Sequence, residues 1–155
     1  MKATGIVRRI DDLGRVVIPR EIRRSLRIRE GDPLELYTQD GAVTFKKYSP
    51  MGSVGEQAIT VFNALREVIN MPCALYDRDS KLTGTKNKNF PENTPDDWIE
   101  SIYDPATRID EIYITPIISD GDKIGFISYV TDTDNTSIHD SVRLAAKTIS
   151  HLYSN

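Results

Sequence analysis

The sequence contains few of the side chains that enzymes and metal sites use. Its 155 residues include one cysteine, Cys73, and two histidines, His139 and His151. One cysteine excludes an internal disulfide and a cysteine-rich zinc site. The histidines stand twelve residues apart, more than three turns of a helix, so they cannot share a metal ion. Since phosphate-loop, nucleophile-elbow and HExxH patterns are also missing, we expect no enzyme activity, no cofactor and no metal.

Long apolar runs are missing as well. No stretch approaches the ~20 apolar residues that cross a bilayer, and the first residues lack the apolar block of a signal peptide. We therefore expect no contact with a membrane, and a protein that stays in the cytoplasm with the nucleoid.

The net charge of −3 is divided unevenly along the chain. Residues 1–53 hold 11 Lys and Arg against 7 Asp and Glu, whereas residues 54–155 hold 9 against 16. Such asymmetry indicates two units with different partners. The sequence predicts a basic N-terminal domain over residues 1–48, a short turn-rich linker over 49–53, and an acidic C-terminal domain over 54–155.

The N-terminal domain is expected to be rich in short strands around one short helix. Strands are expected over residues 4–10, 15–18, 34–37 and 43–47. Asp40-Gly41 is a strong signal for a two-residue hairpin turn. Pro19 is expected as the first helical residue, with Ile22 and Leu26 forming the apolar side of the helix.

So small a domain buries little apolar surface by itself. Below ~70–80 residues a single core rarely supplies more than a few kcal/mol, and this domain has no disulfide or metal to add stability. We therefore predict that it folds as an intertwined dimer of two chains.

Eight arginines and no lysine lie between residues 8 and 29: Arg8, Arg9, Arg15, Arg20, Arg23, Arg24, Arg27 and Arg29. Guanidinium is planar, permanently charged and able to bind phosphate or guanine with two hydrogen bonds. Arg23, Arg24 and Arg27 are expected to share one side of the helix. The alternative is a solvated surface with ion pairs to Asp11, Asp12, Glu21 and Glu30. The clustering, doubled in a dimer, favours DNA phosphates as the partner.

Residues suited to reading adenine edges are scarce here, because residues 1–53 contain no Asn and only one Gln, Gln39. We therefore expect phosphate contacts and arginine contacts, with much of the specificity coming from the shape and flexibility of DNA.

The C-terminal domain is expected to be an α+β sandwich with helices on one face of a sheet. Ser53 with Glu56, and Ser137 with Asp140, are capping patterns that begin two long helices. Their apolar seams are Val54, Ala58, Val61, Leu65 and Val68, and Ile138, Val142, Ala145, Ile149 and Leu152. Each seam packs on its own sheet, or also pairs between subunits.

Strands of the C-terminal domain are expected over residues 73–77, 81–85, 112–119 and 123–131, the last two joined around Asp120-Gly121-Asp122. A short helix from Thr94 carries Trp98 and Ile102. Cys73 lies in an apolar stretch and is expected to be a small buried hydrophobe.

Residues 2–24, KATGIVRRIDDLGRVVIPREIRR, closely resemble the DNA-binding domain of the AbrB family of transition-state regulators, and the match continues over 26–35 and 46–48. The resemblance implies a swapped-hairpin barrel built from two chains, in which Arg8, Arg15, Arg23 and Arg24 carry DNA binding. We add Arg9 and Arg20 as neighbours, and Arg27 from the expected face of the helix. The resemblance also implies AT-rich, loosely defined sites, control of sporulation or transition-state genes, and tetramers formed through the C-terminal domains.

The C-terminal domain is similar to a GAF sensor domain in the strand near Leu75–Asp79, the hairpin Thr115–Gly125 and the bracketing helices. Residues 88–110 are short for the segments that cover a ligand in a GAF domain. Two alternatives stay open: the domain senses a small effector, or it is kept only for assembly.

We therefore expect a DNA-binding transcription regulator. AbrB-like domains also head antitoxins that bind DNA and a toxin, and this is the alternative function. Such antitoxins carry a short disordered tail, whereas this C-terminal part has capped helices and strands.

Overall fold

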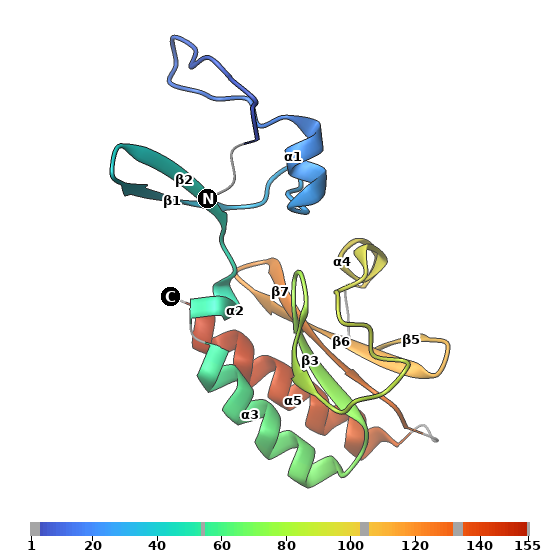
Figure 1. Ribbon diagram of the computed structural model, residues 1–155. Helices are drawn as coiled ribbons and strands as arrows, with labels where there is room; N and C mark the ends of the chain where they lie inside the picture. Colours follow the sequence, from blue (N-terminus) through green and yellow to red (C-terminus); the bar gives the residue numbers. More distant parts are fainter. Residues whose placement is uncertain (1–3, 54, 103–105, 132–134, 155) are drawn as a thin grey trace. The chain divides into compact units, whose positions relative to one another are not determined.

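The computed structural model describes residues 4–53, 55–102, 106–131 and 135–154. Contacts divide the chain into two units, Met1–Tyr48 and Ser49–Asn155 (Figure 1). No helix among these residues is both long enough and apolar enough to span a membrane.

The first unit contains one helix, α1 (Arg20–Ser25), and one hairpin, β1 (Leu34–Gln39) with β2 (Ala42–Lys47). The two strands pair antiparallel, with Gln39 opposite Ala42. Asp40 and Gly41 have φ of 50° and 74°, as the tight turn between twisted strands requires. The hairpin predicted around these two residues is confirmed.

The strands predicted over residues 4–10 and 15–18 are not formed within this chain. The segment instead closes a turn, in which the amide of Asp11 donates to the carbonyl of Arg15 (3.0 Å) and that of Gly14 to Asp11 (3.1 Å). A strand needs a neighbouring strand to pair with, and no described strand of this chain lies in a ladder with these residues.

Helix α1 begins one residue later than predicted. Pro19 has φ −57° and ψ 149° and is the N-cap, so Arg20 is the first helical residue. Glu21 lies in the first turn and Arg23 and Arg24 in the last, an order that complements the helix dipole.

The second unit is an antiparallel sheet with helices. Its elements are α2 (Pro50–Ser53), α3 (Gly55–Ile69), β3 (Cys73–Asp77), β4 (Lys81–Gly84), α4 (Asp96–Ser101), β5 (Thr107–Ile109), β6 (Ile112–Ser119), β7 (Asp122–Tyr129) and α5 (Thr136–Tyr153). The strand order is β4-β3-β7-β6-β5. The four predicted strands are confirmed with shifts of two residues or fewer at their ends, and β5 is an additional strand that the sequence pattern did not indicate.

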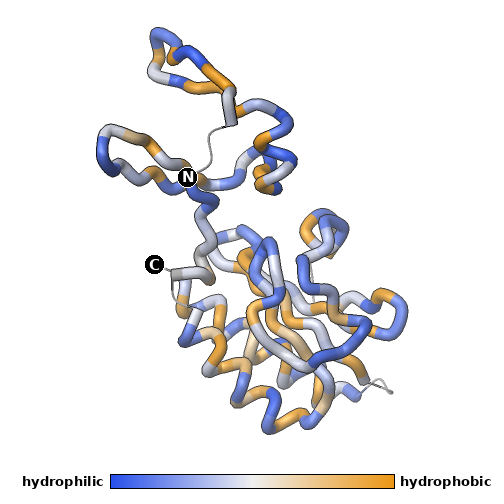
Figure 2. Tube along the Cα trace, in the orientation of Figure 1, coloured by the Kyte–Doolittle hydropathy of each residue, from blue (hydrophilic) through white to orange (hydrophobic). Residues whose placement is uncertain are grey.

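The expected layer of helices lies on one face of the sheet, and the other face is covered as well, which the sequence did not indicate. Helices α3 and α5 pack on one face through residues such as Phe62 and Val142, and Figure 1 shows the two helices side by side. Phe90, Trp98 and Ile102 cover the other face. The reason lies in β3, whose five residues are all buried, since a strand with two apolar faces needs cover on each. Figure 2 shows the resulting concentration of hydrophobic residues in these strands.

The predicted seam of α3 is rotated relative to the observed one. The buried residues are Ala58, Phe62, Leu65 and Ile69, whereas Val68 is 74% exposed. Val54 lies outside the described residues. On α5, Ile138, Val142, Ala145 and Ile149 are buried as predicted, while Leu152 is partly exposed.

Two local expectations at the helix starts need correction. The N-cap of α5 is Asn135, whose side chain accepts a hydrogen bond from the amide of Ser137 at 3.1 Å, so the helix starts earlier than the Ser137 pattern indicated. Residues 50–53, expected within a linker, form α2, in which Met51 is fully buried in the second unit. The side chain of Ser53 lies outside the described residues.

Gly84 is predicted to tolerate no side chain. An added Cβ would lie 2.5 Å from the Cα of Ala74, and the φ of Gly84 is +144°. We expect Gly84→Ala to lower the free energy of unfolding by roughly 1–3 kcal/mol, measured by denaturant melting of the full chain. Gly55→Ala is the control, because its Cβ would meet nothing within 4 Å. Equal stability of both variants would contradict the packing described for β3 and β4.

Candidate nucleic-acid interface

The first basic element is the turn over residues 11–15. The carboxylate Oδ1 of Asp11 accepts hydrogen bonds from the amides of Leu13 (3.0 Å) and Arg15 (2.7 Å). Gly14 has φ of 77°, a conformation that glycine adopts without strain. The turn therefore places Arg8 and Arg9 on the segment that enters it and Arg15 on the segment that leaves it.

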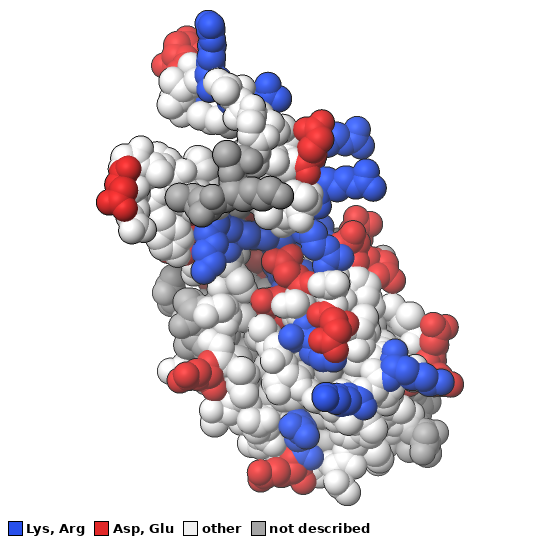
Figure 3. All heavy atoms as spheres, viewed as in Figure 1, with Lys and Arg blue, Asp and Glu red and all other residues white. Residues whose placement is uncertain are grey.

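The second basic element is α1. Arg20, Arg23 and Arg24 lie on this six-residue helix, and all three are exposed. Figure 3 shows blue side chains projecting beside the position of α1, next to acidic ones. The helix is held at its end by the amides of Leu26 and Ile28, which donate to the carbonyls of Ile22 (3.0 Å) and Arg23 (2.7 Å).

Arg27 is not on the helix. It follows the C-cap Leu26 and has φ of 52°, in the left-handed region. The expectation that Arg27 shares a helical face with Arg23 and Arg24 is therefore wrong, because the backbone reverses direction there. Arg27 is nevertheless exposed and close to them in sequence.

Most of these arginines have no acidic partner in their own unit. Within the described residues no ion pair engages Arg8, Arg9, Arg15, Arg20, Arg23 or Arg24, and all six are exposed. This disfavours the alternative of a surface neutralised by internal ion pairs. Six uncompensated guanidinium groups are suited to binding a polyanion.

His139 of the second unit makes a structural contact. Within the described residues of this unit no group of three His, Cys, Asp or Glu side chains could hold a metal ion. Nδ1 of His139 and the hydroxyl of Tyr129 share a hydrogen bond of 2.6 Å. Burial raises the pKa of the Tyr129 phenol to about 12. His139 therefore serves to join β7 to α5.

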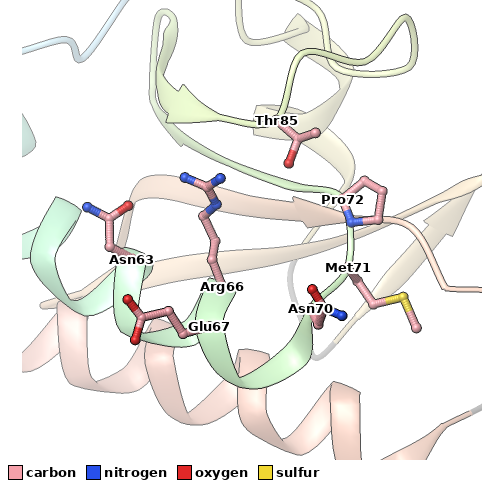
Figure 4. A pocket seen from close by; sticks show the side chains of 7 residues that line it. All are labelled: Asn63, Arg66, Glu67, Asn70, Met71, Pro72 and Thr85. Atoms are coloured by element: carbon pink, nitrogen blue, oxygen red, sulfur yellow. The ribbon is translucent and has the colours of Figure 1, made fainter.

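An open groove of about 730 Å³ lies at the end of α3 (Figure 4). Asn63, Arg66, Glu67 and Asn70 line it from the helix side, and Thr85 lies across from them. In Figure 4 the side chain of Arg66 extends toward the segment that carries Thr85. The groove holds no nucleophile beside a base, and sequence patterns gave no indication of it.

Comparison with known proteins supplies the family. The sequence model described as antidote-toxin recognition MazE, bacterial antitoxin, matches residues 7–52. Stage V sporulation protein T of Bacillus subtilis is 41% identical over 148 residues, which cover 82% of this chain and 83% of that protein. The chain belongs to the AbrB/stage V sporulation protein T family.

Further relatives of the family match the N-terminal unit alone. Transition state regulatory protein AbrB of Bacillus subtilis is 60% identical over 50 residues, 32% of this chain and 52% of that protein. The solution structure of the N-domain of the transcription factor AbrB is 60% identical and covers 31% of this chain and 92% of that chain, with a TM-score of 0.30. The resemblance inferred from residues 2–48 is thus confirmed, and the names of these relatives agree with a regulator rather than an enzyme.

Cys73 is predicted to be unreactive in the folded protein. It is fully buried, and this burial raises the pKa of its thiol from 9.0 to about 11, against a smaller opposite effect of Arg66. At pH 8 the thiolate fraction is then about a hundredfold below that of an ordinary cysteine. We expect a thiol reagent to label Cys73 only after denaturation. Rapid labelling of the native chain would contradict the burial.

Proposed function

We propose that this chain is a transcription regulator of transition-state or sporulation genes that binds AT-rich DNA through arginines of a two-chain N-terminal domain. The observation that supports this proposal is that six arginines of the N-terminal unit are exposed and have no acidic partner among the described residues, in a member of this regulator family. The proposed contacts are Arg8, Arg15, Arg23 and Arg24, with Arg9, Arg20 and Arg27 assisting.

The exposed apolar side chains of the first unit support a domain built from two chains. No residue from 4 to 48 is buried, and Val7 and Val17 are 86% and 74% exposed. Such exposure of apolar side chains marks an interaction surface. In the proposed swapped hairpin, residues 4–10 and 15–18 of one chain pair with strands of the other, which supplies the ladder they lack here.

Dimerisation doubles the arginine set and gives DNA binding a strong dependence on salt. Each phosphate neutralised releases condensed counterions, so affinity falls as salt concentration rises. The same contacts are indifferent to base identity. Preference for AT-rich sites therefore comes from groove shape and ease of bending, together with arginine contacts to base edges.

Arg23→Ala and Arg24→Ala are each expected to weaken DNA binding by roughly 1–3 kcal/mol across many sequences. The slope of log affinity against log salt should shrink with each substitution, because fewer counterions are released. Fluorescence anisotropy with a labelled duplex measures both quantities. Arg66→Ala, an exposed arginine of the second unit, is the control and should change neither. Unchanged affinity in the first two variants would remove them from the interface.

For the second unit we propose assembly of dimers into tetramers. Val68 of α3 and Leu144 of α5 are 74% and 68% exposed, although the two helices pack together on the sheet. Leu65 is buried in the core of its own subunit, so Val68 and Leu144 are the exposed apolar positions, and they define the apolar strip. Exposed apolar side chains on helices suit pairing with the same helices of another subunit.

Charges placed on this strip should break the tetramer. Val68→Glu combined with Leu144→Glu is expected to leave dimers, because a carboxylate is costly to bury in a helix interface. Light scattering of the full chain gives the mass per particle. Asn63→Glu, an exposed position elsewhere on α3, should leave the mass unchanged. A tetramer in the doubly charged variant would reject the proposal.

The antitoxin alternative is favoured by one observation, the match of residues 7–52 to an antitoxin family. Against it, the second unit has two hydrophobic clusters of its own in place of a disordered tail. Cooperative melting of a 49–155 fragment, which keeps the buried Met51, would favour the regulator, and its absence would favour the antitoxin.

A further inference from the structure

The carboxylate of Asp32 is almost completely enclosed, although no residue from 4 to 48 is buried as a whole. Its side chain is 1% exposed, and that of Lys47 is 14% exposed. Oδ2 of Asp32 accepts a hydrogen bond from the amide of Arg29 at 2.8 Å and lies 3.1 Å from Nζ of Lys47. This ion pair connects the end of β2 to the loop that follows α1.

Lys47 also reaches the residue at which the backbone turns. Its ammonium donates to the carbonyl of Arg27 at 2.9 Å, and Arg27 has φ of 52°. A residue other than glycine is strained in this region and stays there when its surroundings hold it. Two side chains restrain the backbone at this turn. The ammonium of Lys47 binds the carbonyl of Arg27, and the carboxylate of Asp32 binds the amide of Arg29.

The turn at Arg27 is linked directly to the arginines of the helix. The amide of Arg27 donates to the carbonyl of Arg24 at 3.3 Å, and the amide of Ile28 to that of Arg23 at 2.7 Å. These bonds fix how the last turn of α1 ends. A change in the Asp32–Lys47 pair is therefore transmitted through Arg27 to the backbone that carries Arg23 and Arg24.

We propose that Asp32 and Lys47 are positioning residues for DNA binding: they set the backbone at Arg27, and with it the direction of Arg23 and Arg24, without contacting DNA. The inference rests on the proposed function. The proposal predicts that removing the carboxylate of Asp32 changes DNA affinity in the direction opposite to simple electrostatics. Removing a carboxylate from a DNA-binding domain raises affinity by simple electrostatics, whereas removal of a positioning carboxylate lowers it.

The decisive pair of variants is Asp32→Asn against Glu30→Gln, each made in the full chain. Both remove one negative charge from the same loop, but Glu30 is exposed. Anisotropy with an AT-rich duplex of about thirty base pairs should show Asp32→Asn binding about tenfold more weakly, a loss similar to that of one arginine contact. Glu30→Gln should bind equally or more tightly.

Lys47→Met against Lys46→Met provides the matched test on the cationic side. Each loses one positive charge from β2, yet Lys46 is exposed. We expect the larger loss of affinity for Lys47→Met. Because Asp32 and Lys47 act as one unit, the double variant should bind about as weakly as the weaker single variant, a failure of additivity that marks coupled residues.

The salt slope separates positioning from the alternatives. Asp32→Asn removes no cation, but a misdirected Arg23 or Arg24 neutralises fewer phosphates, so the slope should shrink together with the affinity, whereas Glu30→Gln should leave the slope unchanged. Light scattering and melting confirm that each variant is a folded assembly at the assay temperature. If Asp32→Asn unfolds there, the lysine pair decides the question.

The proposal is overturned if Asp32→Asn and Glu30→Gln shift affinity alike, or if the two lysine variants lose equal affinity. An additive double variant would also overturn it. Failure of the unchanged protein to bind duplex DNA in dilute buffer would instead reject the proposed function, so the two failures are distinct.

Discussion

The N-terminal unit lacks an interior of its own, and the rest of the molecule depends on this constraint. Hydrophobic burial is the main favourable contribution to folding, yet residues 4–48 of a single chain include no buried residue. In the proposed two-chain domain the missing burial comes from another chain. Folding, association and DNA binding would then be parts of one equilibrium, and the stability of this unit would vary with protein concentration.

The second unit, in contrast, has a hydrophobic core of its own. Two clusters of buried residues lie on the two faces of its sheet, and Trp98 contacts Tyr76 and Phe126 edge-on at 5.0 and 5.9 Å between ring centroids. It has the interior that an independent domain needs. Exposed arginines without acidic partners occur in the described part of the N-terminal unit, which has no core of its own. The second unit, which has a core, exposes apolar side chains on its helices. The division of charge along the sequence thus follows a division of physical roles.

Local signals predicted those parts of the fold that depend on near neighbours. Asp40-Gly41 indicated the hairpin because the turn chemistry is contained in two residues, and the apolar run at Cys73–Asp77 indicated a buried strand. Prediction failed where tertiary context decides. Val68 fits the helical spacing of a core residue but is exposed, because the sheet lies on a neighbouring side of α3. The three residues of β5 are too few to show a pattern.

The composition showed the arginine cluster, but it did not show the backbone conformation of the segment that carries these arginines. Helical spacing alone placed Arg27 with Arg23 and Arg24, whereas the chain leaves the helix at Leu26. Close to that exit Lys47 binds Asp32 and the carbonyl of Arg27, and only the folded chain shows these contacts. Long-range contacts of this kind have no signature in local periodicity.

The connection between the two units is only two residues long. Helix α2 begins at Pro50 and β2 ends at Lys47, so Tyr48 and Ser49 alone bridge them, a reach of about 10 Å. In the proposed assembly of several chains, so short a tether would keep the N-terminal units of different chains near one another. Once one N-terminal unit had bound a duplex, the next would meet the same duplex at high effective concentration. Occupancy would then respond steeply to the spacing of weak sites along a promoter, rather than to the strength of any one of them.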